Sequence, residues 1–144
     1  MTPISKVQVI LSQARPPGVY RFRSRTSETT LRRALEKAGW RLFYLDGREI
    51  HDKASFLHAC AVAMDFPAHV RLSWDAFEEC VNDLSWAPAQ GYVVLFDHAG
   101  RFELAAPHEW ITAMDILEDA VASWRSSTPM YVLVRGAEAI YPDL

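Results

Sequence analysis

Carboxylates recur at intervals of four residues in the segment SWDAFEECVNDLSW, which runs from Ser73 to Trp86. A helix would place Asp75, Glu79 and Asp83 on one face, and the segment contains no lysine or arginine. Like-charged pairs at this spacing cost about 0.2–0.5 kcal/mol each. A helix that keeps this repulsion indicates a surface for a positively charged partner.

The same carboxylates allow an enzymatic interpretation, in which Asp75 and Glu79 form an acid/base pair. Such a pair needs a concave pocket in which one carboxyl group is desolvated, and the segment is flanked by no other catalytic motif. We therefore do not expect an enzyme.

Metal and cofactor motifs are missing from the sequence. The five histidines show no H-x-x-x-H spacing, the two cysteines no C-x-x-C, and there is no P-loop or G-x-S-x-G sequence. Cys60 and Cys80 fall on apolar helical stripes and are expected to be buried, unreactive thiols. We expect no metal and no cofactor.

An amphipathic helix has to position the carboxylates. Ser73 is a favourable N-cap residue. The apolar residues of the segment recur at the i, i+3, i+4, i+7 spacing of one helical stripe, which comprises Trp74, Phe77, Cys80, Val81 and Leu84. The helix is therefore predicted to run through residues 73–86 with its acidic side in solvent.

Strands and helices alternate along the rest of the chain. Strands are predicted at 19–23, 40–45, 92–96 and 130–134, with further helices at 27–38, 52–64 and 107–126; residues 3–13 fit either a short helix or a strand. The continuous apolar run 92–96 is typical of a strand covered on both faces of a parallel sheet. In the last helix, the residues expected to face inward are Ile111, Met114, Leu117, Val121 and Trp124. These features predict an α/β fold with a mostly parallel sheet.

The acidic segment, preceded by DFPAHVRL and followed by GYVVLFDH, resembles the barstar family of intracellular ribonuclease inhibitors. Members of that family carry an N-W-D-A-x-x-D-C-L-type helix after an F-P-x-x-F/Y-G loop. The resemblance begins at the strand and turn 42–47, continues through the helix Asp52 to Met64, and ends at the strand Tyr131–Val134. It implies a small, mostly parallel sheet flanked by helices. Residues 1–40 add an N-terminal strand-helix extension that the prototype lacks.

The resemblance also implies a mechanism and a set of contact residues. In the family, the acidic helix and the loop before it plug the active site of a small guanyl-specific ribonuclease, and carboxylates stand in for the RNA phosphates. Glu79 matches the main acidic position of the family, one methylene longer than its aspartate, and Asp75 matches the aspartate of W-D-A. The expected partner-binding residues are His69, Trp74, Asp75, Glu78, Glu79 and Asp119.

The loop before the helix departs from the family pattern. His69 stands where the family has an aromatic contact residue, and Arg71 replaces a turn glycine. An arginine beside the acidic helix would repel a cationic active site. Two hypotheses therefore stay open: an inhibitor or immunity protein for a basic microbial ribonuclease or related toxin, and a barstar-like interaction domain with a different protein partner.

Charge is segregated along the 144-residue chain. Residues 1–64 carry 11 Lys and Arg against 5 Asp and Glu, whereas residues 65–120 carry 2 against 11. The acidic half disfavours nucleic acid as its direct partner and favours a cationic protein.

Residues 1–17 lack a signal-peptide pattern, and no apolar run reaches membrane-spanning length. We therefore expect a cytoplasmic protein that is monomeric when free, built from an N-terminal extension (1–40) packed on a barstar-like domain (41–135), with a tail (136–144).

Overall fold

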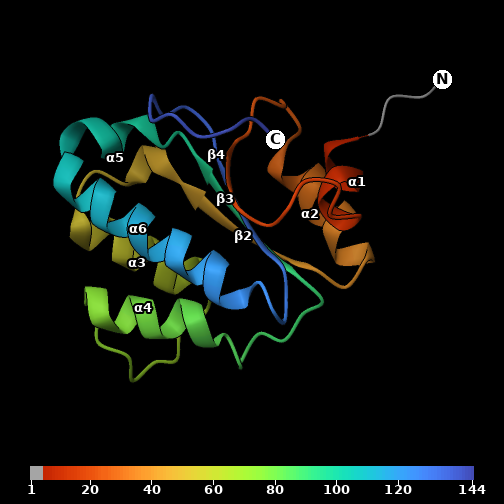
Figure 1. The fold of residues 1–144 in the computed structure, drawn as a ribbon. Helices are drawn as coiled ribbons and strands as arrows, with labels where there is room; N and C mark the ends of the chain where they lie inside the picture. The colour runs from red at the N-terminus through yellow and green to blue at the C-terminus, as the bar shows by residue number, and fades with distance from the viewer. Residues whose placement is uncertain (1–4) are drawn as a thin grey trace.

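The structure, a computed structural model, describes residues 5–144 and is built on one four-stranded parallel sheet (Figure 1). The strands lie in the order β1-β4-β3-β2, and every neighbouring pair is parallel. Their bounds are β1 (Val19–Arg21), β2 (Arg41–Asp46), β3 (Tyr92–Asp97) and β4 (Met130–Val134). The predicted α/β class with parallel pairing is confirmed.

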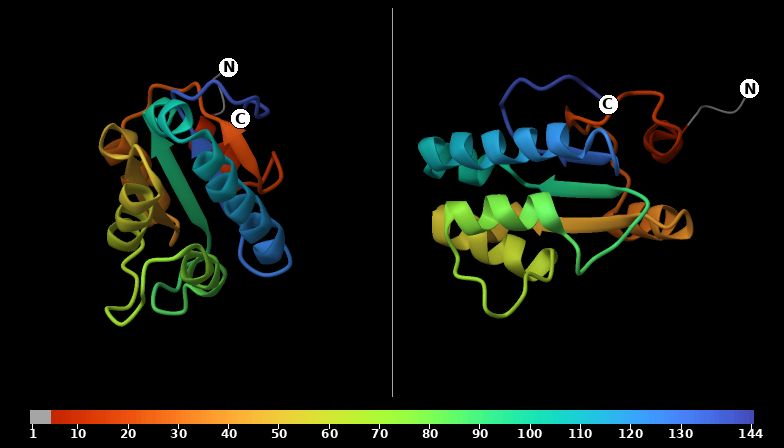
Figure 2. Two further views of the ribbon diagram at one scale, coloured as in Figure 1. Left: turned by 90° about the vertical axis from the view of Figure 1, so that its left-hand side faces the viewer. Right: turned by 60° about the horizontal axis from the view of Figure 1, so that its bottom comes forward.

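Helices cover both faces of this sheet (Figures 1 and 2). One face carries α3 (Lys53–Ala63), α4 (Trp74–Asp83), α5 (Gly100–Ala105) and α6 (Pro107–Trp124), and the other carries α1 (Lys6–Leu11) and α2 (Glu28–Lys37); a 3₁₀ turn, η1 (Gly47–Glu49), follows β2. Within residues 3–13 the structure thus forms a helix, although residues 3 and 4 lie outside the described residues. Of the helices in residues 5–144, none is both long and apolar enough to cross a bilayer.

Burial on both faces of the sheet explains why residues 92–96 of β3 are all apolar. Val94 and Phe96 point into the core under α3–α6, while Val93 and Leu95 point into the core under α1 and α2. All four side chains are fully buried. The expectation of a strand covered on both faces is confirmed.

Residues that precede β2 in the chain cover one face of the sheet. Ile10, Phe22, Leu31 and Leu35 are buried in one core with the β2, β3 and β4 side chains that point away from α3–α6. Ser27 is the N-cap of α2, where its Oγ accepts a hydrogen bond from the Thr30 amide. The apolar stripe of α2 therefore lies directly on the sheet.

The C-terminal segment runs along the outer side of β1. The Arg21 amide donates to the Pro142 carbonyl at 2.8 Å, and the Leu144 amide donates to the Arg21 carbonyl at 3.1 Å. The strand predicted at 19–23 ends at Arg21, and Arg23, two residues beyond it, pairs with Asp143 at 3.1 Å. The outer edge of β1 is thus occupied by residues of the tail.

Two predicted helical details are wrong. The acidic helix ends at Asp83 rather than Trp86, because Leu84 adopts a left-handed conformation (φ 49°) and its amide bonds to the Cys80 carbonyl. Ile111 is 55% exposed, because the buried stripe of α6 includes Ile116 and is shifted away from Ile111.

Candidate functional site

Helix α4 is fixed at its start and along its buried side. The Ser73 Oγ accepts a hydrogen bond from the Ala76 amide at 3.1 Å, as predicted for an N-cap. Phe77 and Val81 are buried in the main core. The helix lies alongside α6 (Figure 2), and the Trp124 indole of α6 donates to the Val81 carbonyl at 2.8 Å. Packing on the main core and on α6 therefore sets the direction in which the outer side of α4 faces.

That outer side carries four exposed carboxylates, on Asp75, Glu78, Glu79 and Asp83. Five ion pairs occur in the described residues 5–144, and none of them includes a residue of α4 or α6. The repulsion between these carboxylates is thus not relieved by an ion pair within the described chain. This is the arrangement expected of a surface that meets an external cation.

A second acidic group lies on the neighbouring helix α6. Asp115, Glu118 and Asp119 are all exposed there. Partial burial of Glu118, together with repulsion from Asp115 and Asp119, raises the pKa of that carboxyl group above its usual value. Glu118 lies on the side of α6 that faces Gly18, Val19 and Tyr141, so a partner-binding role of Asp119 together with α4 stays a prediction.

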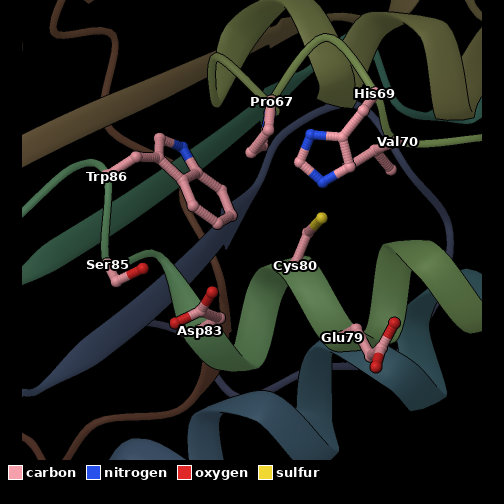
Figure 3. Close-up of a pocket in the computed structure, with 8 residues that line it drawn as sticks. All are labelled: Pro67, His69, Val70, Glu79, Cys80, Asp83, Ser85 and Trp86. Atoms are coloured by element: carbon pink, nitrogen blue, oxygen red, sulfur yellow. The ribbon is translucent and has the colours of Figure 1, made fainter.

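The loop before α4 and the helix itself enclose a hollow of about 570 Å³ (Figure 3). The Cys80 thiol points from α4 toward the His69 imidazole, with Trp86 at one end of the hollow and Glu79 at the other. Burial, reinforced by Asp83 and Glu79, raises the pKa of the Cys80 thiol and so disfavours its reactive thiolate. The lining residues are Pro67, His69, Val70, Glu79, Cys80, Asp83, Ser85 and Trp86.

Trp86 ties the chain after α4 to the start of the loop. Its indole N–H donates to the Met64 carbonyl at 2.9 Å, and its ring meets Phe66 edge-on at 6.1 Å. The loop itself contains a turn in which the Val70 amide bonds to the Pro67 carbonyl. Trp86 therefore links the chain after α4 to the residues at the start of the loop.

Replacing Trp86 by phenylalanine is expected to lower the free energy of unfolding by about 1 kcal/mol, because the Met64 carbonyl loses its donor while an aromatic ring remains. Amide hydrogen exchange should become faster across residues 65–72. Trp124→Phe is the matched control, because it removes an equivalent indole hydrogen bond, to the Val81 carbonyl. Equal exchange rates in the loop for both variants would contradict this role of Trp86.

The six predicted contact residues fall into three groups. His69 and Glu79 line the hollow, and both are exposed. Asp75, Glu78 and Asp119 are exposed but do not line it. The sixth, Trp74, lies at the start of α4.

Trp74 is only half-buried and has an internal packing role. Its ring lies 6.0 Å from Phe56 and 6.2 Å from Phe77, and the Lys53 ammonium sits 5.7 Å above it. Lys53, from the start of α3, is a cation near the acidic helix that sequence reasoning missed. Asp83 was also left out of the expected set, although its spacing from Glu79 was the available signal.

The comparison with known families decides the assignment. Residues 40–135 match the family described as Barstar (barnase inhibitor). The chain belongs to the barstar family. The resemblance seen in the sequence is thereby confirmed, and family membership implies in general an inhibitor that binds a ribonuclease.

Other comparisons bear on the fold alone. No curated protein matches the chain. Among solved structures, the ORC2 protein of Aeropyrum pernix is similar with a TM-score of 0.61 and 17% sequence identity. The match covers 91% of this barstar-family chain and 38% of the ORC2 chain. At this identity the likeness shows a shared arrangement of strands and helices only.

Proposed function

We propose that this barstar-family protein is a non-enzymatic inhibitor that occludes the active site of a small, basic, guanyl-specific ribonuclease or related toxin. The observation that carries the proposal is the exposed carboxylate set of α4, which makes no ion pair within the described chain and borders the hollow formed with the loop. Its contact residues would be His69, Asp75, Glu78, Glu79 and Asp119, with Trp74 supporting the start of the helix.

The inhibition follows from charge and shape. A ribonuclease active site holds cationic side chains that bind phosphate, and carboxylates on a rigid helix can occupy the same positions. The hollow combines apolar walls from Val70 and Trp86 with Glu79 and Asp83 at its margin. Such a lining suits a protruding side chain with an apolar stem and a cationic head. RNA is then excluded because its phosphate positions are filled.

The charge distribution also supports fast association. The acidic residues of α4 and α6 lie on neighbouring helices, whereas the excess of basic residues lies in residues 1–64. An acidic surface accelerates its encounter with a basic partner, and this acceleration is screened over roughly 8 Å at physiological ionic strength. We place this activity in the cytoplasm, with the free inhibitor monomeric and serving as an immunity protein.

The direct test is titration of a guanyl-specific ribonuclease such as barnase. RNA cleavage is expected to fall to zero as the inhibitor approaches one equivalent, and the association rate constant should decrease steeply with added salt. Stopped-flow mixing with a fluorescently labelled ribonuclease measures that rate. Full cleavage activity in excess inhibitor, or a rate that is unaffected by salt, would contradict the proposal.

A second candidate function rests on Arg71. This residue is exposed in the loop before α4 and is not among the residues that line the hollow. A cation at this place favours a partner that carries a carboxylate near its basic patch, and such a partner need not be a nuclease. Stoichiometric capture of a non-nuclease protein that is lost in Glu79→Gln, without inhibition of any guanyl ribonuclease, would favour this second function.

A further inference from the structure

A separate hollow of about 400 Å³ lies at the carboxyl end of the sheet and is lined in part by α5. Its lining comes from the segments that directly follow β2, β3 and β4, and it shares no residue with the hollow beside α4. The carboxyl ends of parallel strands are where open α/β sheets place their ligands. The residues that line it are Arg48, His98, Gly100, Arg101, Leu104 and Gly136.

The lining is basic. Two arginines and one histidine contribute to it, and no carboxylate does. Two carboxylates close by in the sequence are engaged elsewhere: Asp97 is bound by Arg135, and Glu103 accepts a hydrogen bond from the Glu138 amide at 2.7 Å. Asp46 pairs with Arg48 at 2.9 Å and partly compensates its charge. The exposed carboxylates of Glu49 and Glu138 are also near in the sequence, but they do not line the hollow.

The two arginines are held in place by protein contacts. Arg48 donates to Asp46 through Nε at 3.0 Å and through Nη2 at 2.9 Å. Arg101 donates through Nη1 to the Arg48 carbonyl at 2.7 Å. A guanidinium group has five N–H donors, so both arginines keep donors for a ligand in a preorganised geometry.

Close backbone contacts bring the three segments together. A Cβ atom on Gly100 would lie 2.4 Å from the Gly136 carbonyl oxygen, and one on Gly47 would lie 2.1 Å from the His98 carbonyl oxygen. His98 itself has a left-handed backbone (φ 50°), which is uncommon for a residue other than glycine. Side chains at these glycines would push the basic residues apart.

We propose that this basic hollow binds the phosphate group of a small phosphorylated molecule. Guanidinium groups match the oxygens of phosphate with paired hydrogen bonds, and the His98 imidazole can add a donor. Leu104 is 74% exposed at the margin, where it can contact an apolar substituent of the same molecule. Because Asp46 offsets part of the charge, binding is expected to be of modest strength.

Pyrophosphate titrated by isothermal calorimetry into the full chain tests the phosphate site. Saturable binding at one site with a dissociation constant of about 1 mM or lower is expected. Arg101→Gln should weaken it about tenfold or more, since it removes a charged donor. The matched control is Arg33→Gln, an exposed arginine on α2, which should leave the affinity unchanged. Circular dichroism checks that both variants are folded.

Two results would overturn the proposal: pyrophosphate binding that does not saturate, or equal affinities for the parent, Arg101→Gln and Arg33→Gln. Phenyl phosphate tests the apolar margin. Leu104→Ser should weaken phenyl phosphate but not pyrophosphate, and an equal effect on both probes would contradict the contact with Leu104. Ribonuclease inhibition should be unchanged in Arg101→Gln, so this proposal and the proposed inhibitor function fail or succeed independently.

Discussion

Replacing Glu79 by glutamine is expected to weaken binding of the cationic partner by about 2–5 kcal/mol, the range found when one member of a desolvated, hydrogen-bonded charge pair is removed from an interface. Glu79 is exposed on α4, lines the hollow and forms no ion pair within the described chain. Its loss would leave a cation of the partner buried without a counter-charge. Dissociation constants measured by surface plasmon resonance give the change directly.

The same substitution is expected to raise the stability of the free protein. Glutamine removes the repulsion of Glu79 with Asp75 and with Asp83, each worth about 0.2–0.5 kcal/mol. Weaker binding combined with a higher thermal midpoint would identify Glu79 as a residue selected for its partner rather than for the fold.

Glu36→Gln is the matched control, because Glu36 is an exposed glutamate on α2, on the opposite face of the sheet. Its effect on binding should lie within about 0.5 kcal/mol, as is usual for surface positions. Equal losses for both variants, or an unchanged affinity in Glu79→Gln, would contradict the assigned role of the acidic helix.

Replacing Arg135 by alanine is expected to lower the free energy of unfolding by about 3 kcal/mol, because it breaks a largely buried ion pair. Arg135 binds both oxygens of Asp97 at 3.1 Å, and the two side chains are only 16% and 18% exposed. It also donates to the carbonyls of Ser24 and Thr26 at 3.0 and 2.8 Å. One side chain thus fastens the segment before α2 to the end of β3. Urea unfolding followed by tryptophan fluorescence measures the loss.

This ion pair also predicts acid sensitivity. Burial alone would raise the pKa of Asp97, but hydrogen bonds from Arg135 and Tyr44 outweigh it and hold the pKa below its usual value. The resulting stabilisation is fully present above the ordinary aspartate pKa near 4 and is lost as the pH falls through the lowered native value. Arg135→Ala should flatten the decline in stability over this acidic range.

The exposed pair between Arg23 and Asp143 supplies the control. Its side chains are 68% and 55% exposed, so Arg23→Ala should cost no more than about 1 kcal/mol. A comparable loss in both variants, or an acid profile that is unchanged in Arg135→Ala, would show that the Asp97 network does not stabilise the fold.

Local chemistry made much of the fold predictable. Helices α2, α3 and α4 begin directly after Ser27, Asp52 and Ser73, whose side chains accept hydrogen bonds from backbone amides of the first turn. The uninterrupted apolar run of β3 predicted a strand covered on both faces. These signals depend on neighbours within a few residues, and such signals can be read from one chain.

Features that depend on distant residues were not predicted. The end of α4 is set by Leu84 and by the contact of Trp86 with Met64, which is 22 residues earlier. The Lys53 ammonium above Trp74 and the clamp of Arg135 on Ser24 are likewise long-range contacts. Side-chain spacing along one helix contains no information about them.

The candidate site was predictable only where its residues follow from local spacing along the chain. Glu79 and Asp75 follow from helical spacing and from the family pattern, and His69 follows from its place in the loop. The hollow itself needs the loop, α4 and the chain beyond α4 at once. The basic hollow at the carboxyl end of the sheet was missed entirely, because its arginines are separated by 53 residues and meet only in the folded chain.

The burial of Leu31 and Leu35 in one core with side chains of β3 and β4 sets a limit on how this chain can be shortened. Both leucines lie before residue 40, where the match to the family begins, yet they shield strands that belong to the matched part. A version trimmed to residues 40–135 would expose to water the valine, leucine and tyrosine side chains on this face of the sheet. A transfer of this domain to another protein therefore has to include the N-terminal residues that cover this face of the sheet.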